Sequence, residues 1–241
     1  MVVLSGAAFR FGWLWVRRRG ALSLRDRALW ASGTSRRMLR AFGVDSTVSG
    51  EPPPCGLLVS NHLGYFDIFL YSALAPCIFI SKDEVRSWPL LGYLARFAGT
   101  VFINRGSARD GSALLAQIEA PLREGCVVMC FPESASTDGS HVRPFHPLLF
   151  EAAIRAQAPI TPAAVSFRSD ALPEDRLAYW GDDTLLPHLL QATSPKRVRG
   201  QVKFGAALPE VTDRKRAAAA AHRWVADMRE EWKETEKESA V

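Results

Sequence analysis

Short apolar runs alternate with longer, mixed stretches along most of the chain. The short runs are bounded by Gly, Pro and polar residues, as buried strands are, and they predict strands at residues 57–59, 78–81, 100–104, 126–131, 161–167 and 198–204. The longer stretches between them predict helices at residues 66–74, 90–97, 110–123, 147–157 and 184–192. Strands separated by helices are typical of an α/β fold in which a central sheet is covered on both faces.

Two more helices are predicted before the first strand, at residues 2–16 and 21–42. The first is almost entirely apolar, and at 1.5 Å per residue it would be about 22 Å long, short of the roughly 30 Å of a hydrocarbon core. It is also unlike a signal peptide, because the basic residues follow the apolar stretch instead of preceding it. The sequence EPPP at residues 51–54 is a stiff break. We therefore expect an N-terminal helical segment over residues 1–50 and the main domain, with a C-terminal helix, over residues 51–241.

The N-terminal segment holds all of the excess positive charge. Residues 1–50 contain nine arginines against two aspartates, a net charge of +7, whereas the whole chain carries +5. Trp13, Trp15 and Trp30 lie in the same segment. Basic and aromatic residues beside an apolar helix are typical of an element that lies in a membrane interface. Two alternatives are helices that only pack on the domain and a basic arm for nucleic acid, which would not need three tryptophans.

Two other features are expected to be structural only. The four cysteines show no metal-binding spacing and no C-x-x-C pair, which is typical of a reducing compartment, and Cys126 and Cys130 fall in an apolar run where small buried side chains are expected.

The N-terminal segment and the reducing compartment together lead us to expect the protein at the cytoplasmic face of a membrane, on anionic lipids, with no nucleic-acid partner. A last helix is predicted from about residue 212, and its charged end, residues 229–239, is expected to fray and to have no chemical role.

Candidate chemistry follows the first predicted strand directly, in the sequence SNHLGYFD at residues 60–67. His62 would lie at the carboxyl end of a strand, where α/β folds gather functional residues. If a helix begins near Tyr65, Asp67 falls in its first turn and can reach back to one ring nitrogen of His62. The other nitrogen would then be free to accept a proton, as in an oriented general base. A histidine followed five residues later by an aspartate is common, so the pair alone does not establish catalysis.

Further segments follow in order: KDEVRSWPLLG at 82–92, VFINR at 101–105, FPE at 131–133 and ITPAAV at 160–165. Together with the first segment they resemble the four motif blocks of the glycerolipid acyltransferases, the family that contains 1-acylglycerol-3-phosphate O-acyltransferase. The resemblance covers roughly residues 55–210. It implies a central mixed sheet flanked by helices, and transfer of an acyl group from acyl-CoA or acyl carrier protein to the hydroxyl of a lysophospholipid, without a cofactor or a metal.

The resemblance also implies roles for single residues. His62 would remove the proton of the acceptor hydroxyl as that hydroxyl attacks the thioester carbonyl, with Asp67 orienting the imidazole. Glu133 looks like the glutamate of the third block, which holds the acceptor's glycerol hydroxyl. Arg105 looks like the arginine of the second block, whose guanidinium fork engages the acceptor's phosphate. Lys82 is a weaker candidate, because a surface charge explains it equally well.

The third block departs from the family's pattern. The family commonly has FPEGTRS, whereas this chain has FPESAST at residues 131–137, so Ser136 replaces a phosphate-binding arginine. Third blocks with Ser or Thr there, followed by Asp-Gly and an RPF-like stretch, here at residues 143–145, look like a branch that includes lyso-ornithine lipid acyltransferases. Ser136 is therefore expected at the acceptor headgroup, and lyso-ornithine lipid or another lysolipid is the alternative acceptor.

Two other classes of function remain to be weighed. The altered third block is also compatible with an inactive lipid-binding relative, although His62, Asp67, Glu133 and Arg105 are all present. A Ser/His hydrolase using Ser60 is disfavoured, because the chain has no G-x-S-x-G elbow.

Overall fold

The computed structural model describes residues 2–88, 91–103 and 111–239. Within these residues, seven strands form one sheet in the order β1-β7-β6-β2-β5-β3-β4. Neighbouring strands are parallel except β6 and β7, which are antiparallel. The mixed α/β sheet predicted from the sequence is thus confirmed. The strands are β1 (Val44–Ser49), β2 (Gly56–Ser60), β3 (Cys77–Lys82), β4 (Val101–Ile103), β5 (Val127–Cys130), β6 (Ile160–Arg168) and β7 (Val198–Phe204).

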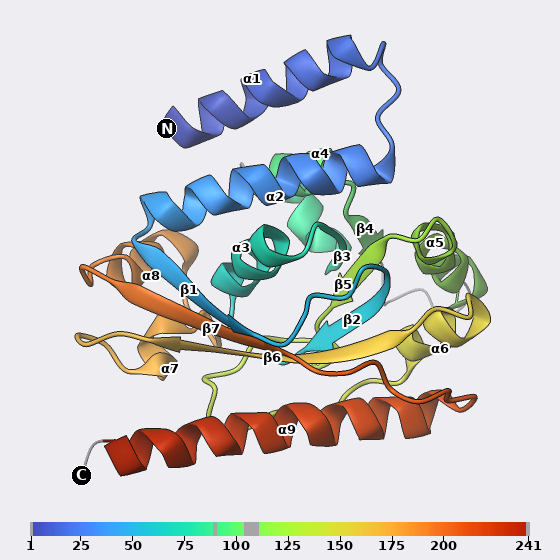
Figure 1. The fold of residues 1–241 in the computed structure, drawn as a ribbon. Helices are drawn as coiled ribbons and strands as arrows, with labels where there is room; N and C mark the ends of the chain where they lie inside the picture. Colours follow the sequence, from blue (N-terminus) through green and yellow to red (C-terminus); the bar gives the residue numbers. More distant parts are fainter. Residues whose placement is uncertain (1, 89–90, 104–110, 240–241) are drawn as a thin grey trace.

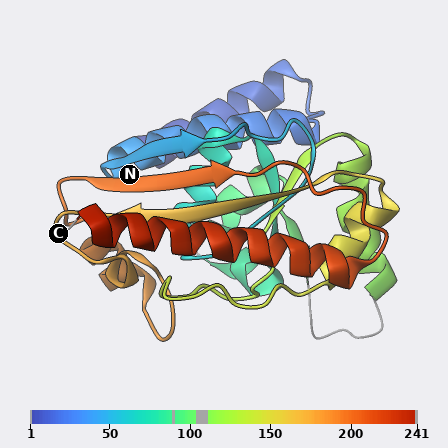
Figure 2. The same cartoon turned by 60° about the horizontal axis from the view of Figure 1, so that its bottom comes forward.

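Helices cover both faces of the sheet (Figures 1 and 2). In Figure 1, α1, α2 and α3 lie above the sheet and the long C-terminal helix α9 runs below it. The helical segments are α1 (Val2–Arg17), α2 (Leu24–Ala41), α3 (Tyr65–Leu74), η1 (Asp83–Ser87), α4 (Leu91–Phe97), α5 (Gly111–Arg123), α6 (Leu148–Arg155), α7 (Glu174–Leu177), α8 (Leu185–Ala192) and α9 (Arg214–Ser239).

Alternate residues of the central strands feed two apolar clusters on opposite faces of the sheet. Leu58 of β2 packs in a cluster with residues of α2 and α3, while Leu57 and Val59 pack with α5, α6 and α9. Cys130 is buried in the second cluster, as predicted, whereas Cys126 is only partly buried. Because β2 is buried on both sides, the residues that follow it are held by a rigid support.

The N-terminal helices form two layers over one face of the sheet (Figure 1). α2 packs on α3, and α1 lies outside α2. Trp30 of α2 is buried, and its indole N–H donates to the carbonyl of Ala7 in α1 at 3.0 Å. Trp30 therefore packs between helices, and of the three N-terminal tryptophans only Trp13 and Trp15 can support the expected membrane attachment, which stays a prediction. Trp13 and Trp15 are more than half exposed.

Two parts of the fold differ from the sequence-based expectation. β1 was not predicted, because Val44 is its one buried residue and the rest of the strand is exposed. Because β1 is part of the sheet, the last residues of the expected N-terminal segment belong to the main sheet. The division of the chain into two segments after residue 50 stays a prediction. The fraying expected for residues 229–239 was wrong, because α9 continues to Ser239 and Arg229 is buried. The expectation that this stretch has no chemical role stays a prediction. No helix of the described ranges is long and apolar enough to cross a bilayer.

Candidate active site

The SNHLGYFD segment lies at the middle of the sheet. β2 runs between β5 and β6 and ends at Ser60, so His62 is the second residue of the short loop that leads into α3. At Gly64 this loop passes close to another segment: a Cβ on Gly64 would lie 2.8 Å from the Cβ of Tyr179. Only glycine fits such an approach, and the loop is thereby held in one conformation.

Asp67, in the first turn of α3, accepts three hydrogen bonds on one carboxylate oxygen. Its Oδ2 lies 2.8 Å from Nδ1 of His62, 2.6 Å from the backbone nitrogen of Leu63 and 3.0 Å from that of Gly64. The Asp67 side chain is fully buried, whereas the His62 side chain is 20% exposed. The predicted contact between the aspartate and the histidine is thus present, and the backbone of the intervening loop shares it.

This contact decides how the imidazole can act. Because the carboxylate of Asp67 is an acceptor, Nδ1 of His62 carries the proton in the neutral ring, and Nε2 is left with a free lone pair. The ring also stacks on Phe131, the residue that follows β5. A carboxylate and an aromatic ring therefore fix the imidazole from two directions. The sequence does not reveal this contact, since an apolar residue after a strand can have many partners.

Glu133 is buried and binds the backbone of two loops. Its Oε1 accepts the backbone N–H of His62 at 2.7 Å, and its Oε2 accepts that of Arg143, also at 2.7 Å. Burial raises the pKa of Glu133 to about 7, against the lowering effect of these two hydrogen bonds. Glu133 thus connects the His62 loop to the loop at Arg143. A contact with the acceptor's hydroxyl stays a prediction.

A cavity of about 360 Å³ lies beside the dyad and is lined mostly by apolar side chains. His62 and Ser136 are part of its lining, which continues between α2, α3, β3 and α4. Trp30, Phe69 and Leu94 represent these helices in the wall. The site therefore joins one titratable ring to a space that suits a hydrocarbon chain.

The other predicted site residues lie in different places. Ser136 and His62 both line the cavity. The expected contact of Ser136 with the acceptor headgroup stays a prediction. Lys82 is exposed and is the one Lys or Arg among the described residues in the cavity wall. Arg105 lies outside the described residues, so its place relative to the dyad stays a prediction. Within the ranges that the structure covers, no group of three or more His, Cys, Asp or Glu side chains could hold a metal ion.

A histidine oriented by a buried carboxylate, beside an apolar cavity, defines a class of site suited to proton transfer on a lipid-like substrate. Comparison with known proteins agrees with this class. The acyltransferase family profile matches residues 48–166. The chain is 33% identical over 186 residues to 1-acyl-sn-glycerol-3-phosphate acyltransferase of Neisseria gonorrhoeae, an alignment that covers 77% of this chain and 73% of that protein. The chain therefore belongs to the glycerolipid acyltransferase family.

Two further similarities refine this picture. The chain is 42% identical over 154 residues to lyso-ornithine lipid O-acyltransferase of Pseudomonas aeruginosa, across 64% of this chain and 59% of that protein. It thus spans less than two thirds of the length of this relative. Its fold matches the crystal structure of the 1-acyl-sn-glycerophosphate (LPA) acyltransferase PlsC of Thermotoga maritima with a TM-score of 0.69 and 18% identity, over 96% of this chain and 94% of that one.

Proposed function

We propose that this protein transfers an acyl group from a thioester donor, acyl-CoA or acyl carrier protein, to a hydroxyl of a lysolipid, with His62 as general base. The observation that carries the proposal is the His62–Asp67 dyad, with its Nδ1–Oδ2 distance of 2.8 Å and the histidine in the wall of an apolar cavity. An alcohol is a weak nucleophile at neutral pH. A base that removes its proton as the C–O bond forms is worth roughly a hundred- to ten-thousand-fold in rate.

Proton transfer closes in one cycle. Nε2 of His62 takes the hydroxyl proton, the alkoxide oxygen bonds to the thioester carbonyl, and the tetrahedral intermediate expels the thiolate, which receives the proton back. Between the two proton transfers His62 is an imidazolium, and the fully buried carboxylate of Asp67 stabilises it. No covalent enzyme intermediate is required.

The cavity suits the hydrocarbon part of a substrate. Each methylene that leaves water for an apolar wall gains about 0.8 kcal/mol, and side chains such as Phe69, Leu91 and Leu94 supply that wall. The same wall includes the imidazole of His62, so a chain seated there would bring its carbonyl or hydroxyl end to the base.

Two acceptors are candidates, each supported by a specific observation. The relatives named for lyso-ornithine lipid, and Ser136 in the cavity wall where the family commonly has arginine, favour a lyso-ornithine lipid acceptor. The Neisseria relative favours 1-acylglycerol-3-phosphate. We assign to Lys82, an exposed residue of the cavity wall, the pairing with a carboxylate or a phosphate of the acceptor. We favour the lyso-ornithine lipid, because a missing arginine removes a cation that a phosphomonoester needs.

We also propose that the reaction takes place at the cytoplasmic face of an anionic membrane. Phe9, Trp13, Trp15 and Val16 of α1 are each more than half exposed, although all four are apolar. Three arginines follow at residues 17–19. An apolar helical surface beside arginines suits the headgroup layer of such a membrane.

The test is an acyl-transfer assay with purified protein, labelled acyl-CoA or acyl carrier protein, and a panel of lysolipids. We expect labelled diacyl product, a loss of about a hundred- to ten-thousand-fold in His62→Ala, and normal turnover in His146→Ala, a matched change at an exposed loop histidine. Free fatty acid instead of product would indicate a hydrolase. No turnover by the wild type on any acceptor would favour the inactive lipid-binding relative.

A further inference from the structure

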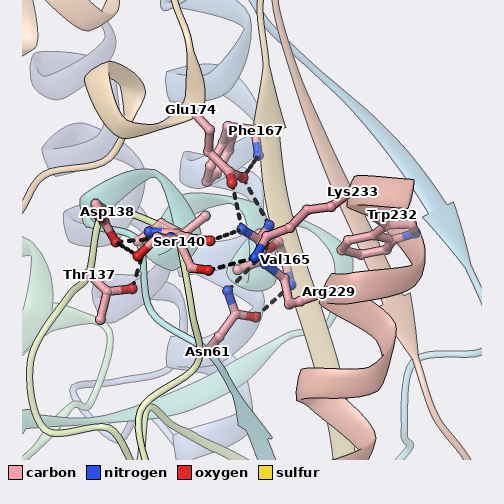
Figure 3. Close-up of polar contacts among 12 residues, drawn as sticks. Asn61, Thr137, Asp138, Ser140, Val165, Phe167, Glu174, Arg229, Trp232 and Lys233 are labelled. Carbon is pink, nitrogen blue, oxygen red and sulfur yellow. Dashed lines mark hydrogen bonds and ion pairs between the residues drawn. The ribbon is translucent and has the colours of Figure 1, made fainter. Parts of the chain in front are cut away.

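Arg229 of α9 is a buried charge far along the chain from the dyad. Its side chain is 4% exposed and forms a two-pronged ion pair with Glu174, the first residue of α7 (Figure 3). Nη1 donates to Oε1 at 2.9 Å and Nη2 donates to Oε2 at 2.5 Å. The same guanidinium donates to two backbone carbonyls, those of Val165 at 3.0 Å and Gly139 at 2.8 Å. Val165, Gly139 and Glu174 are each connected, through further hydrogen bonds, to the loop that carries His62.

The first connection passes through β6. The Asn61 side chain pairs with both backbone groups of Val165, donating to its carbonyl at 3.0 Å and accepting its N–H at 2.9 Å. Figure 3 shows the Val165 carbonyl shared between Asn61 and Arg229. Asn61 directly precedes His62, so the guanidinium and the catalytic loop are held by the same peptide group.

The second connection passes through the third-block loop. Thr137 donates its backbone N–H to the carbonyl of His62 at 2.9 Å, and Gly139 donates its own N–H to the hydroxyl of Thr137 at 3.4 Å. Arg229 holds the carbonyl of Gly139. This loop also carries Ser136 into the cavity wall, so the guanidinium fixes both the base and the residue expected at the headgroup.

The third connection passes through Glu174. Its Oε1 accepts the N–H of Phe167 at 2.8 Å, and α7, which it begins, leads to Tyr179, whose backbone N–H donates to the carbonyl of Leu63 at 2.7 Å. The space around the ion pair is tight. A Cβ on Gly139, at a φ of +83°, would lie 2.6 Å from Oε2 of Glu174 and 2.9 Å from Nη2 of Arg229.

We propose that Arg229, with Glu174 as its partner, is a positioning residue for the His62–Asp67 dyad, which makes the C-terminal helix part of the catalytic apparatus. Arg229 touches no reacting atom, and the inference rests on the proposed role of His62. The arrangement calls for arginine in particular: a planar fork satisfies one carboxylate and two carbonyls at once, whereas the compact ammonium of lysine cannot reach all three.

The decisive variant is Arg229→Lys, which keeps the charge and removes the fork. We expect kcat to fall about ten- to a hundred-fold, with KM within about twofold of wild type, because small displacements of a catalytic group cost this much in rate. The matched control is Arg223→Lys, at an exposed position of the same helix, and it should leave both constants unchanged. Guanidinium ion added to Arg229→Ala should restore part of kcat and should not affect Arg223→Ala.

A spectroscopic readout separates positioning from general stability. In protein labelled with 15N-histidine, the Nδ1 proton of His62 shared with Asp67 should give a low-field resonance that is assigned by its loss in His62→Ala. We expect Arg229→Lys to weaken or broaden that resonance while the backbone amide spectrum stays folded. If Arg229→Lys does not fold, Glu174→Gln, which keeps the size of the carboxylate, takes its place with the same measurements.

The outcomes distinguish this inference from the proposed function. An active His62→Ala would overturn the role of His62 as base, whatever Arg229 does. An inactive His62→Ala, together with unchanged kcat and an unchanged His62 resonance in Arg229→Lys, would overturn the positioning role alone. A folded Arg229→Lys that loses rate only through a higher KM would also contradict it.

Discussion

The imidazole of His62 lies flat on the ring of Phe131, with the two centroids 4.0 Å apart and the ring planes 11° from parallel. Stacking restricts rotation of the imidazole about its last torsion angle, and Asp67 fixes the direction of Nδ1 within the ring plane. The face of an aromatic ring also attracts a cation, so Phe131 favours the imidazolium that forms when the base has taken its proton. In the proposed mechanism, Phe131 therefore both orients His62 and stabilises its charged form.

Replacing this ring should reduce the rate without removing the base. In Phe131→Leu we expect kcat to fall by about twofold to thirtyfold, the equivalent of about 0.5–2 kcal/mol for a lost cation–aromatic contact. Steady-state kinetics between pH 5 and 9 measure the change. Phe145→Leu, at a buried ring in the cluster on the other face of the sheet, should lower the melting temperature and leave kcat unchanged. Equal kcat values for wild type and Phe131→Leu would show that the stack has no catalytic role.

Asp67→Asn should affect the chemical step more than binding. The amide can still accept the N–H groups of Leu63 and Gly64, but it removes the charge that holds the proton on Nδ1 and stabilises the imidazolium. We expect kcat to fall about a hundred- to ten-thousand-fold with KM little changed. The control is Asp182→Asn, at an exposed aspartate. Turnover of Asp67→Asn within a few-fold of wild type would contradict the orienting role.

A change at Ser136 should alter which headgroup is preferred. Ser136→Arg places a guanidinium in the cavity wall beside His62, where it can pair with a phosphomonoester. We expect the ratio of kcat/KM for 1-acylglycerol-3-phosphate over lyso-ornithine lipid to rise by at least about tenfold, since a charge-assisted hydrogen bond contributes about 1.5–3 kcal/mol. Ser136→Gln adds length without charge and should not change the ratio. An unchanged ranking in Ser136→Arg would place the headgroup elsewhere.

Glu133 predicts a dependence of stability on pH. Because burial raises its pKa to about 7 in the folded state, above the roughly 4.3 of an exposed glutamate, the folded protein binds a proton more tightly than the unfolded chain does. The contribution of Glu133 is therefore fully present below about pH 4.3 and is lost as pH rises to about 7, with a slope of at most about 1.4 kcal/mol per pH unit.

Urea unfolding of wild type and Glu133→Gln between pH 5 and 8 measures this contribution. The free energy of unfolding of wild type minus that of the variant should decrease from pH 5 to about 7 and then level off. A difference that stays constant from pH 5 to 8 would mean that Glu133 is ionised in both the folded and the unfolded state over this range, held by the N–H groups of His62 and Arg143.

Several features of fold and site could be predicted because short-range patterns carry them. The strands β2 and β5 are continuous apolar runs, and the His62–Asp67 contact spans five residues of one strand–loop–helix unit. β1 could not be predicted, since an edge strand with one buried side chain has no apolar pattern. Arg229 could not be predicted either. In a charged helical stretch it resembles any solvated residue, and its partners lie 55, 64 and 90 positions away.

Membrane attachment is tested better by substitutions on α1 than by deletion of the N-terminal segment. Removing residues 1–45 would take away α2 as well as α1, and α2 contributes Met38 and Leu39 to the core. Loss of binding in such a truncated chain could then follow from unfolding alone. Substitutions on the outer face of α1 avoid this, because Phe9, Trp13 and Trp15 are exposed.

We expect the triple change Phe9→Ser, Trp13→Ser and Trp15→Ser to release the protein from anionic liposomes and to cost far more activity on bilayer substrates than on detergent-dispersed ones. A lysolipid chain of about 16 carbons resists leaving the bilayer by on the order of 10 kcal/mol, so the enzyme must come to the lipid.

Flotation at low and high salt separates the electrostatic and the apolar contributions to binding. Salt screens the arginines, each worth about 1 kcal/mol near an anionic surface, but does not weaken apolar burial, so wild type should float in part even at high salt. The matched control is Leu186→Ser with Leu190→Ser, two leucines of α8 that are each 66% exposed, and it should float like wild type. Equal flotation of the triple variant and wild type at both salt concentrations would show that α1 is not the anchor.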